Sequence, residues 1–260
     1  MGPDTTLPLH VWGPPEAPVL VCLHGFLGTG ADWADLAARL PNRRVLAPDL
    51  PGHGAAVEQP DRAYTFEGAV EAVLATLDAA GVEGFALLGY SMGGRLALAL
   101  ALAAPTRVSA LLLESASPGL RTEAERDERR RLDAERAEAL RADLPRFLHD
   151  WYRLPLFATL SPAQRSRLEA ERARGDAAAL AHALEGLGTS AQPDLWPELP
   201  HLAMPTTAIA GALDAKFVAI ARTMQAAHPP MRVEVVPGTG HNVHVEAPEA
   251  FADIVQAVTG

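Results

Sequence analysis

The sequence predicts an α/β fold with a mostly parallel central sheet, flanking helices and an inserted helical cap. Short apolar runs alternate with amphipathic segments along most of the chain. The apolar runs are continuous, which is typical of parallel strands buried on both faces. One long segment interrupts this alternation and contains no convincing strand. The length of 260 residues and the apolar content of 48% suit one domain with a full core and an insertion.

Each expected element follows from this alternation. Expected strands cover residues 19–23, 44–47, 85–89, 108–113, 206–210 and 232–236. Expected helices cover residues 31–40, 66–80, 92–104, 217–227 and 248–258. A β-α-β order places helices on both faces of the sheet.

The interrupting segment is expected to form the cap, residues 115–200, between two parts of the core, 1–114 and 201–260. Residues 121–153 contain nine arginines and nine acidic residues. This composition is typical of solvated helices with charge pairs one turn apart. The Ala, Glu and Arg content of the cap also favours helix.

Composition excludes several classes of function. The formal net charge of −10 argues against nucleic-acid binding, which needs a basic surface. Cys22 is the single cysteine, so no disulfide within the chain is expected. The sequence contains no secretory signal and no apolar run of the ~18 residues that a membrane span needs. These features predict a cytoplasmic protein, and they leave its oligomeric state open.

A nucleophile motif stands at residues 89–93, Gly-Tyr-Ser-Met-Gly. It follows an expected strand and precedes an expected helix, which is the context that a G-x-S-x-G motif requires. A sharp turn there would present Ser91 Oγ at a helix N-terminus, where the helix dipole favours developing negative charge.

A serine nucleophile needs a base, and the base needs an acid that orients it. Asp214 and His241 each follow an expected strand, in the order Ser, Asp, His. His244 is a rival for His241, and Glu198 and Glu234 are rivals for Asp214. We prefer His241 because it directly follows a glycine-rich loop, and Asp214 because neither glutamate lies just after a strand.

An oxyanion hole is expected from the backbone N–H groups of Phe26 and Met92. Met92 follows the expected nucleophile, and Phe26 ends an early strand in the segment His-Gly-Phe. His24 is expected to brace this loop. No spacing of histidines and cysteines predicts a metal, and no glycine pattern predicts a nucleotide site.

Several segments together resemble the α/β-hydrolase superfamily. They are HGF at 24–26, DLPGHG at 49–54 and GYSMGGR at 89–95. More narrowly, the chain resembles the 2-succinyl-6-hydroxy-2,4-cyclohexadiene-1-carboxylate synthases of menaquinone biosynthesis over residues 19–251. The narrower resemblance rests on SPGL at 117–120, DWY at 150–152, QPDL at 192–195, DAKF at 214–217 and GHN at 240–242.

This resemblance implies a lyase that removes a ring proton and expels pyruvate from an enolpyruvyl cyclohexene dicarboxylate. Ser91 would be the base, supported by His241 and Asp214, and the oxyanion hole would stabilise a dienolate. No cofactor would be needed. Leu213, Ala215, Val243 and Val245 depart from the polar neighbours that the resemblance would admit, which bears on fine substrate contacts only.

A small anionic substrate of this kind needs cations near the serine. Arg95 lies one helical turn after Ser91, and the resemblance places further carboxylate-binding arginines at Arg129 and Arg172. Because the cap is rich in arginine, the alternatives are Arg126, Arg130 and Arg174. Tyr90 and Trp151 would line the pocket, although Trp151 could equally be a packed cap aromatic.

The alternative function is a serine hydrolase that cleaves carboxylic esters or carbon–carbon bonds through an acyl-enzyme on Ser91. Both functions use the same three residues. Arginines that converge on Ser91 would favour the lyase, and an apolar cap floor would favour the hydrolase. A non-enzymatic binding protein is disfavoured, because no member of the expected triad is missing.

Overall fold

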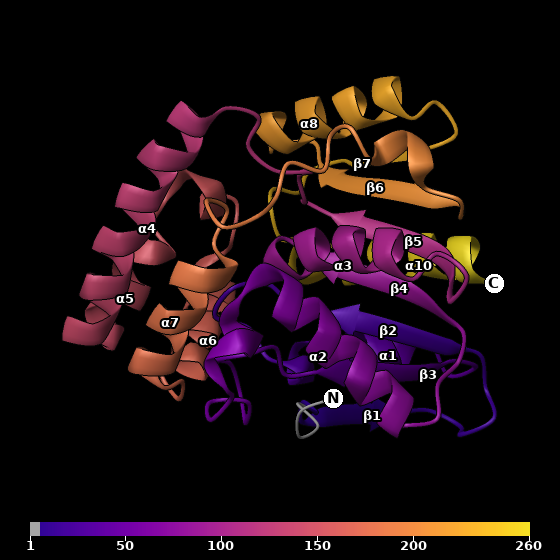
Figure 1. The fold of residues 1–260 in the computed structure, drawn as a ribbon, viewed down its shortest axis with the longest axis horizontal. Helices are drawn as coiled ribbons and strands as arrows, with labels where there is room; N and C mark the ends of the chain where they lie inside the picture. The colour runs from indigo at the N-terminus through magenta and orange to yellow at the C-terminus, as the bar shows by residue number, and fades with distance from the viewer. Residues whose placement is uncertain (1–5) are drawn as a thin grey trace.

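A seven-stranded sheet forms the centre of the computed structural model, which describes residues 6–260. The strands are β1 (Leu9–Trp12), β2 (Val19–Leu23), β3 (Arg44–Pro48), β4 (Phe85–Tyr90), β5 (Val108–Glu114), β6 (Thr206–Gly211) and β7 (Arg232–Val236). Their order in the sheet is β1-β3-β2-β4-β5-β6-β7 (Figure 1). All neighbouring pairs are parallel except β1 and β3 at the edge. The predicted α/β class is therefore confirmed.

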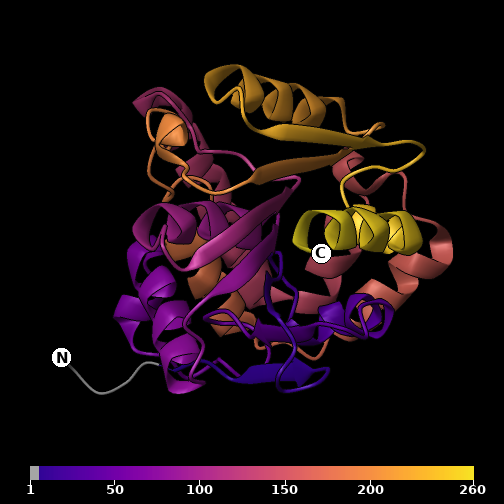
Figure 2. The same ribbon diagram turned by 90° about the vertical axis from the view of Figure 1, so that its right-hand side faces the viewer.

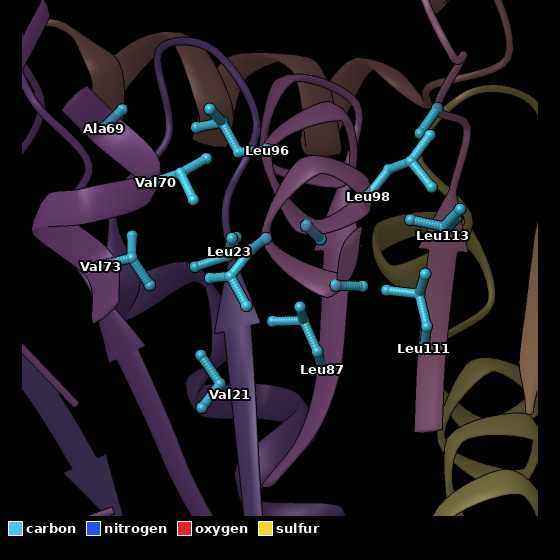
Figure 3. Close-up of a cluster of buried hydrophobic side chains, with 14 of the residues drawn as sticks. Val21, Leu23, Ala69, Val70, Val73, Leu87, Leu96, Leu98, Leu111 and Leu113 are labelled. Atoms are coloured by element: carbon cyan, nitrogen blue, oxygen red, sulfur yellow. The ribbon is translucent and has the colours of Figure 1, made fainter. Parts of the chain in front are cut away.

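Helices cover both faces of this sheet. They are η1 (Gly30–Trp33), α1 (Ala34–Arg39), η2 (Asp61–Tyr64), α2 (Phe66–Ala79), α3 (Met92–Ala103), α8 (Ala215–Ala227), α9 (Val243–Glu246) and α10 (Pro248–Thr259). Figure 2 shows α10 and α8 from the side on which the chain ends. Successive strand residues point to opposite faces. Val21 and Leu23 therefore join the cluster under α2 and α3 (Figure 3), whereas Leu20 and Cys22 join the one under α1 and α10.

The chain between β5 and β6 is helical. It contains α4 (Glu123–Ala142), α5 (Leu144–Trp151), η3 (Pro155–Phe157), α6 (Pro162–Arg172), α7 (Ala177–Leu187) and η4 (Leu199–His201). Helices α4 to α7 stand beyond the carboxyl ends of the strands in Figure 1. They bury an apolar cluster of their own that includes Leu140, Phe147 and Leu184. An inserted helical region is thus confirmed, while its expected boundaries at 115 and 200 stay a prediction.

The structure corrects several elements. Strand β1 was not expected, because its four residues are only partly buried and pair antiparallel at the sheet edge. The helix expected at 31–40 is a 3-10 turn followed by a short α-helix. Helix α8 begins two residues before 217, because the Asp214 side chain accepts a hydrogen bond from the Phe217 N–H and caps it. Within residues 6–260, no helix combines the length and the apolar character that crossing a membrane requires.

Candidate active site

Ser91 occupies a strained turn between β4 and α3. Its φ of 51° and ψ of −108° lie in a region that side chains rarely adopt. The turn is tight because a Cβ on Gly89 would come within 2.4 Å of the Gly93 carbonyl oxygen. A Cβ on Gly93 would lie 2.3 Å from the Leu23 carbonyl oxygen. Helix α3 can therefore approach β2 and β4 only with glycine at these positions.

The structure brings Ser91, His241 and Asp214 together. His241 Nε2 lies 3.3 Å from Ser91 Oγ, and His241 Nδ1 lies 2.8 Å from Asp214 Oδ2. The imidazole and the carboxylate are buried, while Ser91 is partly exposed. In this arrangement Nδ1–H donates to the carboxylate, so that Nε2 is free to accept the serine proton.

Two further side chains hold the loop that carries His241. The Glu246 carboxylate accepts hydrogen bonds from the backbone N–H groups of Gly240 at 2.9 Å and Asn242 at 3.2 Å. Ser115 Oγ donates to the His241 carbonyl oxygen at 2.9 Å. These contacts fix the imidazole by fixing its backbone.

A cavity of about 620 Å³ opens at Ser91, lined by residues that follow the carboxyl ends of β2, β4 and β7 and by residues of the inserted helical region. We call it the Ser91 cavity. Six of the preferred site residues line it: Phe26, Tyr90, Ser91, Trp151, Arg172 and His241. Arg95 and Arg129 are not among its lining residues, so the expected convergence of three arginines on Ser91 stays a prediction for these two.

Arg95 is on the first turn of α3 and is not a lining residue of the Ser91 cavity. Its backbone N–H donates to the Ser91 carbonyl oxygen at 3.0 Å. The guanidinium is buried, and its Nη1 has no hydrogen-bond partner among the described residues. Burial, and then the nearby Arg129, lower the pKa of Arg95 to about 9, whereas Asp133 acts to raise it.

Arg129 approaches this site from α4. Its Nε donates to Asp133 Oδ1 at 2.7 Å, and Arg136 lies 4.0 Å from the same oxygen. We call Arg95, Arg129, Arg136 and Asp133 the arginine cluster. Asp133 acts electrostatically on Arg95 and Arg136 and is hydrogen-bonded to Arg129, so within the cluster positive charge exceeds negative charge. Arg95 is buried, whereas Arg129 and Arg136 are partly exposed. Such a site favours an added anion.

Arg172, the last residue of α6, lines the Ser91 cavity but already has a carboxylate partner. Its Nη1 and Nη2 donate to the two oxygens of Asp32 at 2.7 and 2.6 Å. Burial acts to lower the pKa of Arg172, but Asp32 and Tyr152 outweigh it and the pKa is raised. The pair joins α6 to η1, which follows the loop that contains Phe26.

Tyr90 and Trp151 contribute aromatic surface to the cavity. The Tyr90 ring lies 5.5 Å from the His241 ring and 4.7 Å from the His244 ring. Trp151 stacks on Phe147 at 5.5 Å and meets Phe26 edge-on at 5.6 Å. Trp151 therefore lines the pocket and is also packed within the cap, so both readings of this residue hold.

The rival residues do not belong to the hydrogen-bonded set of Ser91, His241 and Asp214, although His244 lines the same cavity. His244 pairs with Glu114, Glu198 pairs with His201 at the surface, and Glu234 is exposed on β7. Arg126 and Arg130 pair with Glu123. Arg174, the alternative to Arg172, does line the Ser91 cavity.

The loop expected to supply an oxyanion donor is braced as predicted. His24 Nδ1–H donates to the Gly25 carbonyl oxygen at 2.9 Å, and His24 Nε2 accepts the Leu50 N–H at 2.9 Å. Met92 is the first residue of α3, so its N–H has no acceptor within the helix. Among residues 6–260, no group of three or more His, Cys, Asp or Glu side chains could hold a metal ion.

Sequence reasoning missed Asp32, Glu114 and Glu246, whose carboxylates orient residues of the site. None stands in a recognisable motif, and each meets its partner only through the fold. Glu114 alone carried a signal, because it ends a strand next to the expected nucleophile strand.

Comparison with known proteins agrees with this architecture. A family model described as the alpha/beta hydrolase fold matches residues 18–248. A relative from Bacillus subtilis (strain 168) is 39% identical over 249 residues, which are 94% of this chain and 90% of the relative. A protein of Serratia proteamaculans (strain 568) named 2-succinyl-6-hydroxy-2,4-cyclohexadiene-1-carboxylate synthase is 38% identical over 242 residues, 92% of either chain. The structure of MenH from S. aureus is similar with a TM-score of 0.91 and 34% identity, over 96% of this chain and 97% of that one.

Proposed function

Because the chain belongs to the α/β-hydrolase fold family, and within it to the 2-succinyl-6-hydroxy-2,4-cyclohexadiene-1-carboxylate synthases, we propose that it is a carbon–oxygen lyase of menaquinone biosynthesis. Its substrate is an enolpyruvyl cyclohexene dicarboxylate that bears a succinyl group. The products are pyruvate and the cyclohexadiene carboxylate for which the family is named.

Ser91 is the base that removes the ring proton. Its hydroxyl proton passes to His241 Nε2, 3.3 Å away, and Asp214 compensates the charge on the imidazole. The serine oxygen then takes the carbon-bound proton, so no acyl-enzyme forms. This role needs a hydrogen-bonded Ser–His–Asp set at one edge of the cavity, which the distances support.

The electrons of the broken C–H bond move toward the succinyl ketone and give a dienolate. The N–H groups of Phe26 and Met92 stabilise its oxygen, because donors preorganised at an oxyanion suit an enolate as well as a tetrahedral intermediate. The α3 dipole adds to this effect at its N-terminus.

The arginine cluster is the observation that carries the choice of an anionic substrate. A buried guanidinium with an unpartnered Nη1, one turn from Ser91, is costly unless an anion completes it. We assign this anion to a substrate carboxylate held by Arg95 and Arg129. Binding there requires the cavity to extend past Ser91 when the substrate enters.

Arg172, which the resemblance implies as a carboxylate ligand, already has a carboxylate partner in Asp32. Its bidentate pair with Asp32 leaves only Nε without a partner. A substrate carboxylate must therefore reach Arg172 beside Asp32 or replace it. Arg174, on the same cavity wall, is the second cation available to that carboxylate.

The alternative is a hydrolase that acylates Ser91, since the same geometry serves an ester substrate. Product analysis separates the two functions. With the enolpyruvyl substrate we expect stoichiometric pyruvate, and catalytic efficiency far above that for p-nitrophenyl acetate. Ester cleavage without pyruvate release would establish the hydrolase instead.

A further inference from the structure

A second buried pair of a carboxylate and an imidazole lies beside Ser91. Glu114 is the last residue of β5, and it is fully buried. Both of its carboxylate oxygens lie 2.9 Å from His244 Nδ1, and the His244 backbone N–H donates to Oε1 at 3.1 Å. The Glu114 carbonyl oxygen also accepts the Ser91 N–H at 2.9 Å. A backbone hydrogen bond thus connects Glu114, and through it His244, to the turn that carries Ser91.

The orientation of His244 resembles that of His241. In each ring Nδ1 faces a buried carboxylate, which leaves Nε2 for another partner. Nε2 of His241 faces Ser91, whereas Nε2 of His244 makes no hydrogen bond to another described residue. His244 lines the Ser91 cavity, and its side chain is 11% exposed. Rings of Trp33 at 5.0 Å and Tyr90 at 4.7 Å hold the imidazole on two sides.

The Tyr90 ring packs against both imidazoles, and both histidines line the Ser91 cavity. A purely structural role for His244 would be to donate a hydrogen bond from Nδ1 to the buried Glu114 carboxylate, which needs donors. That structural role does not require the rest of the imidazole ring to line the Ser91 cavity.

The proposed elimination has two separate sites of proton transfer. At the first, Ser91 takes the ring proton. At the second, the carbon–oxygen bond breaks and its electron pair goes to the enolpyruvate oxygen. The His241 imidazole is hydrogen-bonded to Ser91 and therefore acts at the first site.

We propose that His244, positioned by Glu114, is the general acid that protonates the departing enolpyruvate oxygen. This inference rests on the proposed function. For this step His244 carries a proton on each ring nitrogen: Nδ1–H stays donated to Glu114, and the Nε2 proton moves to the enolpyruvate oxygen as the carbon–oxygen bond breaks, which leaves the neutral ring. The product is the enol of pyruvate, which becomes the ketone in water. Water then returns a proton to His244 and accepts the one held by the triad, so the reaction is neutral in protons.

The test is His244→Asn, which keeps an N–H donor for Glu114 and removes the proton carrier. Pyruvate release and deuterium uptake into unreacted substrate are measured together in D₂O. Removing a general acid costs about 10² to 10⁴ in rate. We expect kcat to fall at least about 100-fold. The recovered substrate should carry ring deuterium, because the dienolate now returns to substrate before the bond breaks.

The matched control is His201→Asn, since His201 forms a His–Glu pair with Glu198 at the surface. It should match the wild type in both measurements. The melting temperature of each variant is measured as well. If His244→Asn does not fold, His244→Gln, which places an amide near the Nε2 position, is tested in the same way.

Unchanged pyruvate release in a folded His244 variant would overturn the inference alone. So would slower release without deuterium in the substrate, since that would place the defect at proton removal. If the wild type released no pyruvate, the proposed function would fail and this inference with it.

Discussion

Gly93 permits the closest approach in the site. A Cβ there would stand 2.3 Å from the Leu23 carbonyl oxygen and 2.4 Å from that of His24, both of which are backbone atoms that cannot swing aside. Gly93→Ala should therefore displace α3 and Ser91 and destabilise the fold by several kcal/mol, as strained core substitutions do. Urea unfolding measures this loss.

Gly84→Ala is the matched control, because its Cβ would meet only the Arg107 carbonyl oxygen at 3.8 Å. It should change the free energy of unfolding by less than about 1 kcal/mol. Equal stabilities of the two variants would contradict the role assigned to this contact.

Arg95→Met keeps the length of the side chain and removes the charge. A hydrogen bond to a charged group contributes about 1.5–3 kcal/mol, so kcat/KM for the dicarboxylate should fall roughly 10- to 100-fold. Turnover of a neutral ester should be unchanged. Steady-state kinetics on both substrates checks this.

Arg130→Met is the control for charge alone, since Arg130 is an exposed cap arginine paired with Asp127 and Glu123. It should resemble the wild type on both substrates. Equal losses on the acid and on the ester in Arg95→Met would show that Arg95 is structural.

At the scale of elements, the Asp32–Arg172 pair joins α6 to η1, the 3-10 helix that follows β2. Breaking a buried pair leaves one charge uncompensated, which costs about 3–5 kcal/mol, whereas exposed pairs contribute about 0–1 kcal/mol. Because this pair borders the cavity, with side chains 9% and 16% exposed, we expect roughly 3 kcal/mol for Asp32→Asn. The midpoint of urea unfolding reports the change.

Glu185→Gln provides the comparison, because Glu185 forms a bidentate pair with Arg141 in the same helical region but is exposed. Its midpoint should be close to that of the wild type. An equally small shift for Asp32→Asn would mean that the Asp32–Arg172 pair does not hold the cap to the core.

Regular elements were predictable where periodicity or a cap gives a local signal. The core strands are continuous apolar runs, and helix α3 follows its motif directly. Strand β1 was missed because its pairing with β3 is a tertiary contact of a short edge segment. The same distinction applies to the site. Local motifs located Ser91, Asp214 and His241, whereas contacts made only by the fold have no sequence signal. No motif shows that Asp32 takes Arg172, or that Arg95 turns toward Arg129.

The whole molecule should be sensitive to acid because of buried histidines. Burial, followed by the neighbouring His24, lowers the pKa of His53 to about 3. Between its usual value of 6.5 and 3, the unfolded chain binds a proton that the folded protein excludes. The free energy of unfolding should therefore decrease as pH falls through this window, by up to roughly 5 kcal/mol.

His53→Asn can keep the hydrogen bond to the Pro51 carbonyl oxygen, which is 3.0 Å from Nδ1, and cannot titrate. Its unfolding free energy should depend less on pH between 6.5 and 3 than that of the wild type. His201→Asn, at an exposed histidine, should preserve the wild-type slope. A His53→Asn slope as steep as that of the wild type would contradict this account.

The central claim is that Ser91, oriented by His241 and Asp214, starts the release of pyruvate from a dicarboxylate. The most direct measurement is the rate of pyruvate formation by folded Ser91→Ala relative to the wild type on the enolpyruvyl substrate. Removing a triad serine costs several orders of magnitude, so we expect a loss of at least about 1,000-fold with an unchanged melting temperature. Pyruvate release near the wild-type rate would contradict the claim.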